Sequence, residues 1–398
     1  MAHICMLVFN NYSTDPRVRR EAEALVERGD TVDCICLGNG MNKITSLAGV
    51  RLFCVSAGKY NGSNPLFHVT AYLRFFCYVF VKAAVLHFRK PYDIVQAHTM
   101  PDFLVFAALV PKLFGARIIL DIHDLMPELY IAKFGSSYRN WAVRFIIWVE
   151  KRSVAFADKA IAVHEPHLDI LAKHGNPPDK FSIVLNVPDP RIFVGGPARS
   201  APSRRPFRLI YHGSIPRRAG LEVALRAVAH CRKEIPDIEF QIVGAGEDVR
   251  RLSGLTQELG LSDCVEFKPG VPVEQLPAIL NEAAVGVIPY AADAFTQYVL
   301  PTKLMEYAAL GIPVIVSRLR TIQRYFDESA VVCFQSGDDV ELASQILWLH
   351  RNPSAARRLA SNAFRLAEAH NWRQQREVYF RLVDSLLPVR PTIFANAG

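Results

Sequence analysis

The sequence contains no cysteines with the spacing of a metal site. Its 8 cysteines include neither a Cys-x-x-Cys pair nor a Cys/His group with zinc spacing, which excludes the zinc-finger classes. Most of them fall in apolar runs that resemble strands, so we expect buried, reduced thiols and a cytoplasmic protein. These residues are Cys5, Cys34, Cys36, Cys54, Cys77, Cys231, Cys264 and Cys333.

Signals for export and membrane insertion are also missing. Met-Ala-His at the start leads into a short apolar run with no basic region and no cleavage site, so we expect no signal peptide. No apolar run reaches the about eighteen residues that span a bilayer. The most apolar stretch, residues 66–90, is interrupted by Arg74, Lys82, Arg89 and Lys90.

Charge of one sign is not concentrated in any run. The 46 Lys and Arg residues exceed the 38 Asp and Glu residues and give a net charge of +8, but no basic tail of the nucleic-acid-binding kind occurs. A diffuse basic excess suits phosphate-bearing substrates or an anionic membrane surface. With 51% hydrophobic residues over 398 positions, the chain is long and apolar enough for two globular domains.

No Gly-x-Gly-x-x-Gly follows the first expected strand, His3–Phe9, which argues against a dinucleotide-dependent dehydrogenase. Apolar strands alternate instead with amphipathic helices, as in a doubly wound parallel sheet. The alternation occurs twice, on either side of a segment rich in proline and glycine. We therefore predict an α/β fold of two Rossmann-like domains that face a cleft, over residues 1–186 and 207–370 with a linker at 187–206.

The most informative stretch follows the apolar run Val285–Ile288, which predicts a buried strand. Pro301 and Thr302 then open a helix that ends at Gly311. A helix N-terminus at the carboxyl end of a strand presents free N–H groups and a positive dipole end. Phosphate is the usual occupant of such a site.

Two charged residues lie in the first turns of this predicted helix. Lys303 adds a cation to the phosphate site, whereas the carboxylate of Glu306 suits a ribose hydroxyl. An ordinary solvated ion pair is the alternative, because such pairs are common on helices.

A second group of polar residues follows the expected strand Arg117–Ile122. His123 lies just past its carboxyl end, where open α/β sheets bind ligands, and Asp121, Asp124 and Glu128 flank it. This setting makes His123 a functional candidate. Carboxylate–histidine groups also bind metals, but these residues lack the spacing of a dedicated site, so we expect no metal.

Glycines follow two expected strands of the second half. Gly213 comes directly after the strand Phe207–His212, and Arg217 and Arg218 precede a helix, which predicts another anion cradle. Two merely solvated arginines are the alternative. Gly244 opens a Gly-x-Gly turn after a further strand, which is a weak signal alone.

Two segments carry a resemblance to a known family. The segments PTKLMEYAALGIPV (301–314) and DIHDLMPE (121–128) resemble the donor-binding motif and the D-x-H-[DE]-x-x-P-E block of retaining GT-B glycosyltransferases of the family-four, Glycos_transf_1-like type. The resemblance covers nearly the whole chain. Many members carry two glutamates in the pattern E-x7-E. This chain has Tyr298 in place of the first glutamate and Glu306 as the second.

The resemblance implies a hexosyl-type transferase that retains configuration, uses a nucleotide-diphosphate sugar and needs no cofactor or metal. It also implies that the last helix, at 371–390, crosses back to the first domain. The first domain would bind the acceptor and the second the donor. Catalytic candidates are His123 and Glu128; donor-binding candidates are Gly213, Arg217, Arg218, Gly244, Pro301, Thr302, Lys303 and Glu306; acceptor-side candidates are Arg17, His98 and Asp124.

Two expected helices, 66–90 and 140–156, interleave aromatic and basic residues, which suits an anionic membrane surface. Packing in the core is the alternative. The family often uses polyprenyl-diphosphate-linked acceptors, so we expect a lipid-linked glycan acceptor, a role in cell-surface polysaccharide synthesis, and a peripheral location on the inner face of the cell membrane.

Two other functions stay open. A nucleotide-sugar epimerase of the GT-B type would need a full acid/base set, which the sequence does not supply. A non-catalytic nucleotide- or glycan-binding subunit would fit if Tyr298 marks a degenerate site.

Overall fold

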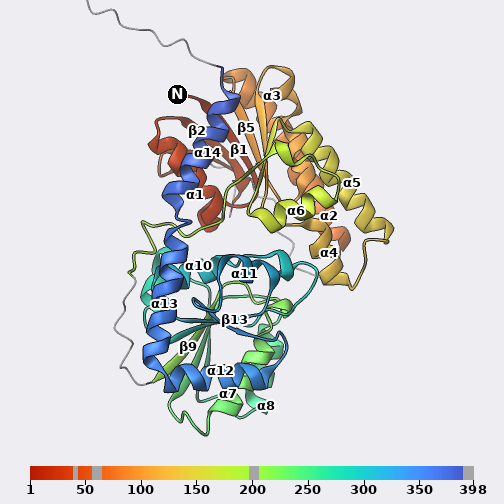
Figure 1. Ribbon diagram of the computed structural model, residues 1–398. Helices are drawn as coiled ribbons and strands as arrows, with labels where there is room; N and C mark the ends of the chain where they lie inside the picture. The colour runs from red at the N-terminus through yellow and green to blue at the C-terminus, as the bar shows by residue number, and fades with distance from the viewer. Residues whose placement is uncertain (39–43, 56–64, 197–205, 389–398) are drawn as a thin grey trace, which may run out of the picture. The chain divides into compact units, whose positions relative to one another are not determined.

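The computed structural model describes residues 1–38, 44–55, 65–196 and 206–388 (Figure 1). The chain divides into two compact units. The first holds residues 1–130, 136–185 and 373–398, and the second holds residues 131–135 and 186–372. Each unit is a mainly parallel sheet covered by helices.

The sheet of the first unit has strand order β3-β4-β2-β1-β5-β6-β7-β8. All neighbouring strands are parallel except β3 and β4. The order reverses between β1 and β5, and sheets of this kind bind ligands at the carboxyl ends of strands near such a point. The strands are β1 His3–Asn11, β2 Thr31–Leu37, β3 Ile44–Leu47, β4 Val50–Val55, β5 Ile94–His98, β6 Arg117–Ile122, β7 Lys159–Ala162 and β8 Phe181–Ile183.

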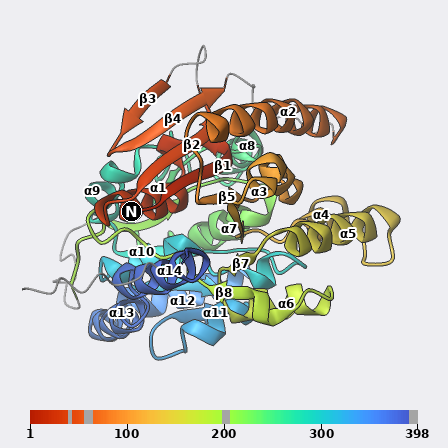
Figure 2. The same cartoon turned by 90° about the horizontal axis from the view of Figure 1, so that it is seen from above.

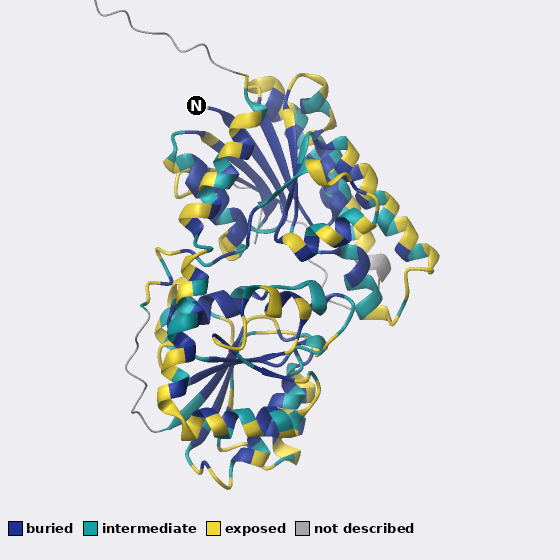
Figure 3. Cartoon of the chain, in the orientation of Figure 1, coloured by how far each residue is buried: buried dark blue, intermediate teal, exposed yellow. Residues whose placement is uncertain are grey.

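These strands form the core because their apolar runs are covered on both faces. Ile4, Met6 and Leu7 of β1 have no exposed surface. Figure 3 shows the strands of both units mostly in dark blue, with exposed residues on the outer faces of the helices. The strands expected at His3–Phe9 and Arg117–Ile122 are confirmed.

Helices cover this sheet, and one of them begins with a well-formed cap. Asp15 accepts a hydrogen bond from the Val18 amide, and Pro16 occupies the first helical position of α1. The helices of the unit are α1 Pro16–Glu27, α2 Pro65–Arg89, α3 Leu109–Leu113, α4 Met126–Phe134, α5 Trp141–Phe156, α6 Glu165–Lys173 and α14 Trp372–Leu386, with 3₁₀ turns η1 Tyr12–Thr14, η2 Asp102–Ala108 and η3 Pro178–Lys180.

Among the described residues, one helix is long and apolar enough to cross a membrane by length and composition. It is α2 over Val69–Arg89, with a mean hydropathy of 1.6. The expectation that no segment reaches this limit was therefore wrong. α2 nevertheless packs against β1 and η2, and its residues Phe75, Val79 and Ala83 are buried; Figure 2 shows the helix near β1.

The last helix, α14, belongs to the first unit although it follows the second unit in sequence. The Tyr379 hydroxyl donates to Gln96 Oε1 of β5 at 2.6 Å, and the Leu185 amide donates to Gln375 Oε1 at 3.0 Å. Gln96 Nε2 in turn donates to Glu21 of α1 at 2.8 Å. Buried hydrogen bonds thus join α14 to the strands and to α1.

The second unit has a six-stranded parallel sheet of order β11-β10-β9-β12-β13-β14. Its order reverses between β9 and β12, so the carboxyl ends of these two strands mark the expected ligand position. The strands are β9 Phe207–His212, β10 Ile238–Val243, β11 Val265–Lys268, β12 Val285–Ile288, β13 Val314–Ser317 and β14 Val332–Phe334. The helices are α7 Leu221–Cys231, α8 Val249–Glu258, α9 Leu276–Leu280, α10 Thr302–Ala309, α11 Arg320–Tyr325, α12 Asp339–Arg351 and α13 Pro353–Glu368, with 3₁₀ turns η4 Arg217–Ala219, η5 Val273–Gln275 and η6 Thr296–Tyr298.

Candidate active site

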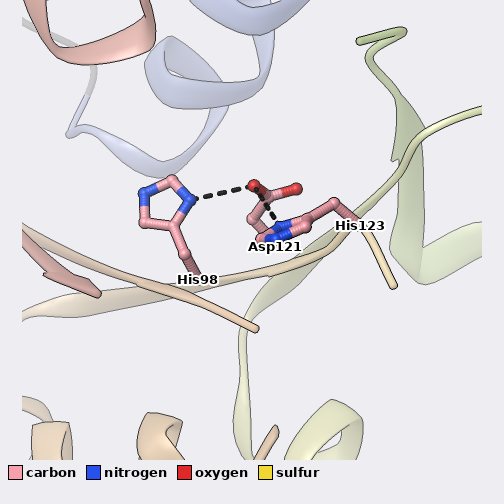
Figure 4. Close-up of side chains that lie close together, drawn as sticks. All are labelled: His98, Asp121 and His123. Atoms are coloured by element: carbon pink, nitrogen blue, oxygen red, sulfur yellow. Dashed lines mark hydrogen bonds and ion pairs between the residues drawn. The ribbon is translucent and has the colours of Figure 1, made fainter. Parts of the chain in front are cut away.

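In the first unit, three polar side chains meet at the carboxyl ends of β5 and β6. His98 is the last residue of β5 and lies in register with Asp121 on β6, while His123 follows the end of β6 (Figure 4). The parallel register alone brings His98 beside Asp121 across 23 residues of sequence. We call these three residues the histidine–aspartate cluster.

Asp121 is the centre of this cluster and is fully buried. Its Oδ2 lies 2.9 Å from His98 Nδ1 and 3.5 Å from His123 Nδ1. Arg17 binds both carboxylate oxygens, with Nε 2.8 Å from Oδ2 and Nη2 2.7 Å from Oδ1. Burial by itself would raise the pKa of Asp121, but Arg17 and the two histidines outweigh it and hold that pKa well below its ordinary value.

His123 is the exposed member of the cluster, with 21% of its side chain accessible. Its amide is fixed by a bond to Thr99 Oγ1 at 3.2 Å. Burial by itself would lower the pKa of His123, but Asp121 and Asp124 outweigh it and raise the pKa to about 9. At neutral pH His123 is therefore an imidazolium, which can donate a hydrogen bond and a positive charge to a ligand but cannot accept a proton as a base.

The ligand atoms of the cluster all lie within 4.8 Å of one another, which is close enough to hold a metal ion. The charge around them favours a hydrogen-bonded cluster instead. The Arg17 guanidinium occupies both oxygens of Asp121 and would repel a metal cation.

Arg17 and Glu128 have other surroundings than we expected. Arg17, an acceptor-side candidate, is 3% exposed. Its guanidinium donates to Asp121 and to the Val184 carbonyl, so it supports the cluster. Glu128, a catalytic candidate, is fully buried. It accepts from the Tyr138 hydroxyl at 2.6 Å and lies 3.1 Å from His174 Nε2, which is a positioning role.

The other two acceptor-side candidates differ in access. His98 has no exposed surface, whereas Asp124 is half-buried beside His123. Of the candidates in the first unit, His123 and Asp124 alone combine proximity to the cluster with an accessible side chain.

In the second unit, α10 begins at Thr302 with Pro301 at its N-cap, as predicted. Lys303 is 8% exposed, and its Nζ lies 3.9 Å from the centre of the Tyr211 ring and 5.1 Å from that of Tyr290. Electron-rich ring faces stabilise a buried ammonium. Burial by itself would lower the pKa of Lys303, but the two tyrosines outweigh it and the pKa lies above its ordinary value, so the cation persists.

Two of the predicted glycines lie where backbone segments approach closely. Gly213 has φ +108°, and a Cβ there would lie 3.3 Å from Lys303 Nζ. Gly244 has φ +155°, and a Cβ there would lie 1.9 Å from the Gly213 carbonyl oxygen. Only glycine allows the loops after β9 and β10 to close on each other beside Lys303.

Glu306 lies one turn after Lys303 and is 8% exposed. Its Oε2 is 2.6 Å from Nε2 of His212, the last residue of β9. The sequence analysis did not identify His212, because nothing in an isolated apolar strand shows that its final residue faces a helix 94 residues later.

The predicted basic pair lies in η4. Arg217 is exposed, whereas Arg218 is half-buried with its guanidinium 5.2 Å from the centre of the Phe295 ring. The Arg218 carbonyl also accepts from the Ala291 amide at 3.0 Å, which fixes this turn beside the segment after β12. Arg218 is thus the less exposed of the two cations.

Two protein families match the chain, one in each half. The family described as "Glycosyl transferase 4-like domain" matches residues 14–186, and the family "Glycosyl transferases group 1" matches residues 198–366. Among curated proteins, the chain is similar to D-inositol 3-phosphate glycosyltransferase of Streptomyces coelicolor, with 25% identity over 353 residues that cover 81% of this chain and 75% of that protein.

Solved structures share the fold. Sucrose-phosphate synthase from Thermosynechococcus elongatus matches with a TM-score of 0.76 and 21% identity, over 97% of this chain and 99% of that one. Anabaena HepE in complex with UDP-glucose matches with a TM-score of 0.73 and 15% identity, over 97% of this chain and 100% of that one.

Proposed function

Because this chain belongs to the GT-B glycosyltransferases of the family-four type, we propose that it transfers a hexosyl group, with retention of configuration, from a nucleotide-diphosphate sugar to a glycan acceptor. The observation that carries the donor assignment is the buried pair on α10. Lys303 stays charged at the helix N-terminus beside two glycine loops, and Glu306 follows one turn later. A cation for phosphate and a carboxylate for ribose thus lie about one helical turn apart on α10.

The leaving group of this reaction is a nucleoside diphosphate, whose terminal phosphate gains charge as the sugar departs. Lys303, Arg218 and the free N–H groups at the start of α10 would bind that charge. These groups are held by packing before the reaction, so little reorganisation is needed. They supply the stabilisation that a metal ion provides elsewhere, in line with a metal-independent reaction.

In the first unit, His123 would donate a hydrogen bond to a sugar hydroxyl. Its imidazolium state is set by Asp121 and Asp124, and its accessible edge can reach a hydroxyl oxygen. Asp121 and Glu128 are both enclosed and engaged, so neither is available as a nucleophile. Attack by the acceptor on the face that the leaving group vacates accounts for retention without a covalent intermediate.

The acceptor is proposed to be a lipid-linked glycan of cell-surface polysaccharide synthesis, reached at an anionic membrane. α5 exposes Trp141, Phe145 and Trp148 by 80%, 56% and 52%. Phe145 stacks on Trp148 with ring centres 5.8 Å apart, and Arg152 lies over the Trp148 ring. An aromatic face with an adjacent cation suits the headgroup level of an anionic bilayer, so the chain would be peripheral on the inner face of the membrane.

Incubation with a panel of UDP-, GDP- and ADP-sugars tests the reaction. We expect nucleoside diphosphate release from one donor, faster with a polyprenyl-diphosphate-linked glycan, and an NMR spectrum of the product with the anomeric configuration of the donor. An inverted product would contradict retention. Conversion of the donor into an isomeric nucleotide sugar without release would favour the epimerase alternative, and binding without turnover would favour the non-catalytic one.

A further inference from the structure

A buried histidine links the sheet of the second unit to the carboxylate of Glu306. His212 is 4% exposed at the end of β9. Its Nε2 lies 2.6 Å from Glu306 Oε2, and its Nδ1 lies 2.9 Å from the hydroxyl of Tyr307. The two rings meet edge to face, with centres 5.0 Å apart. Both nitrogens of His212 are therefore engaged, each with a neighbouring residue of α10.

We propose that His212 is a positioning residue that fixes the Glu306 carboxylate for a pair of ribose hydroxyls, so that the site selects ribonucleoside over deoxyribonucleoside diphosphates. This inference rests on the proposed function, because it takes Glu306 to be the ribose contact.

The strand beside Tyr307 is adapted to hold this arrangement. Gly286 lies in the middle of β12, where glycine normally weakens a strand. A Cβ on Gly286 would lie 2.6 Å from Cδ2 of the Tyr307 ring. Glycine is therefore required at this position for the ring to lie where its hydroxyl reaches His212, since even a methyl group would displace it.

The number of available hydrogen atoms determines which group donates in each of these contacts. A neutral histidine carries one N–H and a tyrosine carries one O–H. The Tyr307 hydroxyl lies 2.9 Å from His212 Nδ1 and 3.3 Å from the Ile210 carbonyl oxygen, and when it donates to the nearer Nδ1 the N–H of His212 lies on Nε2 and donates to Glu306. One oxygen of the Glu306 side chain is then fixed. Among the described residues nothing binds its Oε1, which remains for a ligand hydroxyl.

A fixed carboxylate binds better than a free one, because less side-chain freedom is lost when the ligand arrives. The gain applies only to a ligand that uses the carboxylate. A diphosphate without the ribose hydroxyls still binds Lys303 and the helix N-terminus, but gains nothing from His212. Loss of His212 should therefore lower the affinity for ribonucleotides and not that for deoxyribonucleotides.

Calorimetric titration of the full chain with UDP and GDP, and with their 2′-deoxy and 3′-deoxy forms, tests this. The wild type should prefer the ribonucleotide about tenfold, equivalent to about 1.4 kcal/mol. His212→Phe, which keeps a ring but removes both nitrogens, should lose about tenfold for the ribonucleotide and little for the deoxy forms. His212→Gln, whose amide can donate near the Nε2 position, should keep most of the preference, and Glu306→Gln should lose it.

Each outcome decides a different point. If the wild type binds neither of these ribonucleotides nor ADP, the proposed function and this inference both fall. If Glu306→Gln loses the ribose preference but His212→Phe keeps it, the donor site stands and the inference falls. Equal losses for both sugar types in His212→Phe would make His212 a core residue only. Should that variant not fold, Tyr307→Phe removes one oxygen from the same chain of contacts and should cost about threefold for the ribonucleotide alone; an unchanged preference would overturn the proposal.

Discussion

At the scale of single residues, the two candidate cations, one in each unit, are stabilised in different ways. Lys303 is enclosed by aromatic rings and stays charged, whereas His123 owes its charge to carboxylates and keeps an accessible edge. The first is suited to hold a phosphate throughout the reaction. The second can lose its proton within an accessible pH range, so its contribution should depend on pH.

Lys303→Ala should weaken binding of the nucleoside diphosphate by about 1.5–3 kcal/mol, because a charge-assisted hydrogen bond is lost. Isothermal calorimetry measures the change. The matched control is Arg358→Ala, which removes an exposed cation of α13 in the same unit and should leave affinity unchanged. Wild-type affinity in Lys303→Ala would remove the donor-site assignment.

His123→Ala should lower turnover strongly and leave nucleotide affinity nearly intact. The pKa of His123 is raised to about 9, so the imidazolium is present below that value and is lost as the pH rises through it. Turnover of the wild type should therefore fall above pH 9. A pH profile that is the same in His123→Gln as in the wild type would assign the fall to another group.

Sequence reasoning found the residues whose position follows from local pattern. His123 and Lys303 each follow a buried strand, and strand ends can be read from apolar runs. The partners of residues that act over a long sequence separation were not predicted. Arg17 pairs with Asp121 over a separation of 104 residues, and neither periodicity nor composition encodes such a pairing.

At the scale of elements, a buried ionic group ties α4, α5 and the end of α6 together. His174, just after α6, lies 3.1 Å from Glu128 of α4 and 3.0 Å from Glu150 of α5. Asn176 also donates to Glu150 at 2.6 Å. The loop that carries His123 leads directly into α4, so these contacts help to hold the loop in place.

The contribution of His174 to stability should depend on pH. Burial by itself would lower its pKa, but Glu128 and Glu150 outweigh it and raise the pKa to about 9. A raised pKa means that the contribution is fully present below the unfolded value of about 6.5 and is lost as the pH rises through 9. The expected loss is on the order of 3 kcal/mol.

Urea unfolding of the wild type and His174→Gln at pH 6.5 and 9.5 measures this loss. The variant should be the less stable protein at pH 6.5, and the difference should shrink at pH 9.5. His230→Gln is the control, because His230 pairs with Asp339 at the surface and should contribute little at either pH. A difference that does not change with pH would show that His174 acts by packing alone.

At the scale of the whole molecule, the exposed apolar surface is unevenly distributed. In the first unit it includes Trp141 and Trp148 of α5, Phe88 of α2 and Phe114 after α3, with the last two rings 4.9 Å apart. The alternative was that these helices place their aromatic residues in the core. Phe75 of α2 is a residue of that kind. A surface of this kind marks an interaction site more often than a free face.

Flotation with liposomes tests the membrane proposal. The wild type should float with anionic vesicles at low salt and less with neutral ones, and Trp141→Ser with Trp148→Ser should abolish flotation. Trp348→Ser is the matched control, since it removes a 41% exposed tryptophan of α12 in the second unit. Equal flotation with neutral vesicles would remove the electrostatic part of the proposal, and no flotation would remove it entirely.

The position of α14 has a consequence for synthesis of the protein. A chain leaves the ribosome from its N-terminus, and domains generally fold as they emerge. The hydrogen-bond partners of Gln96 and of the Leu185 amide, however, are Tyr379 and Gln375. These two residues emerge only after the whole of the second unit. The first unit to be made is thus the last to be completed. A purified chain that ends at residue 371 should show the second unit resistant to protease and the first still sensitive.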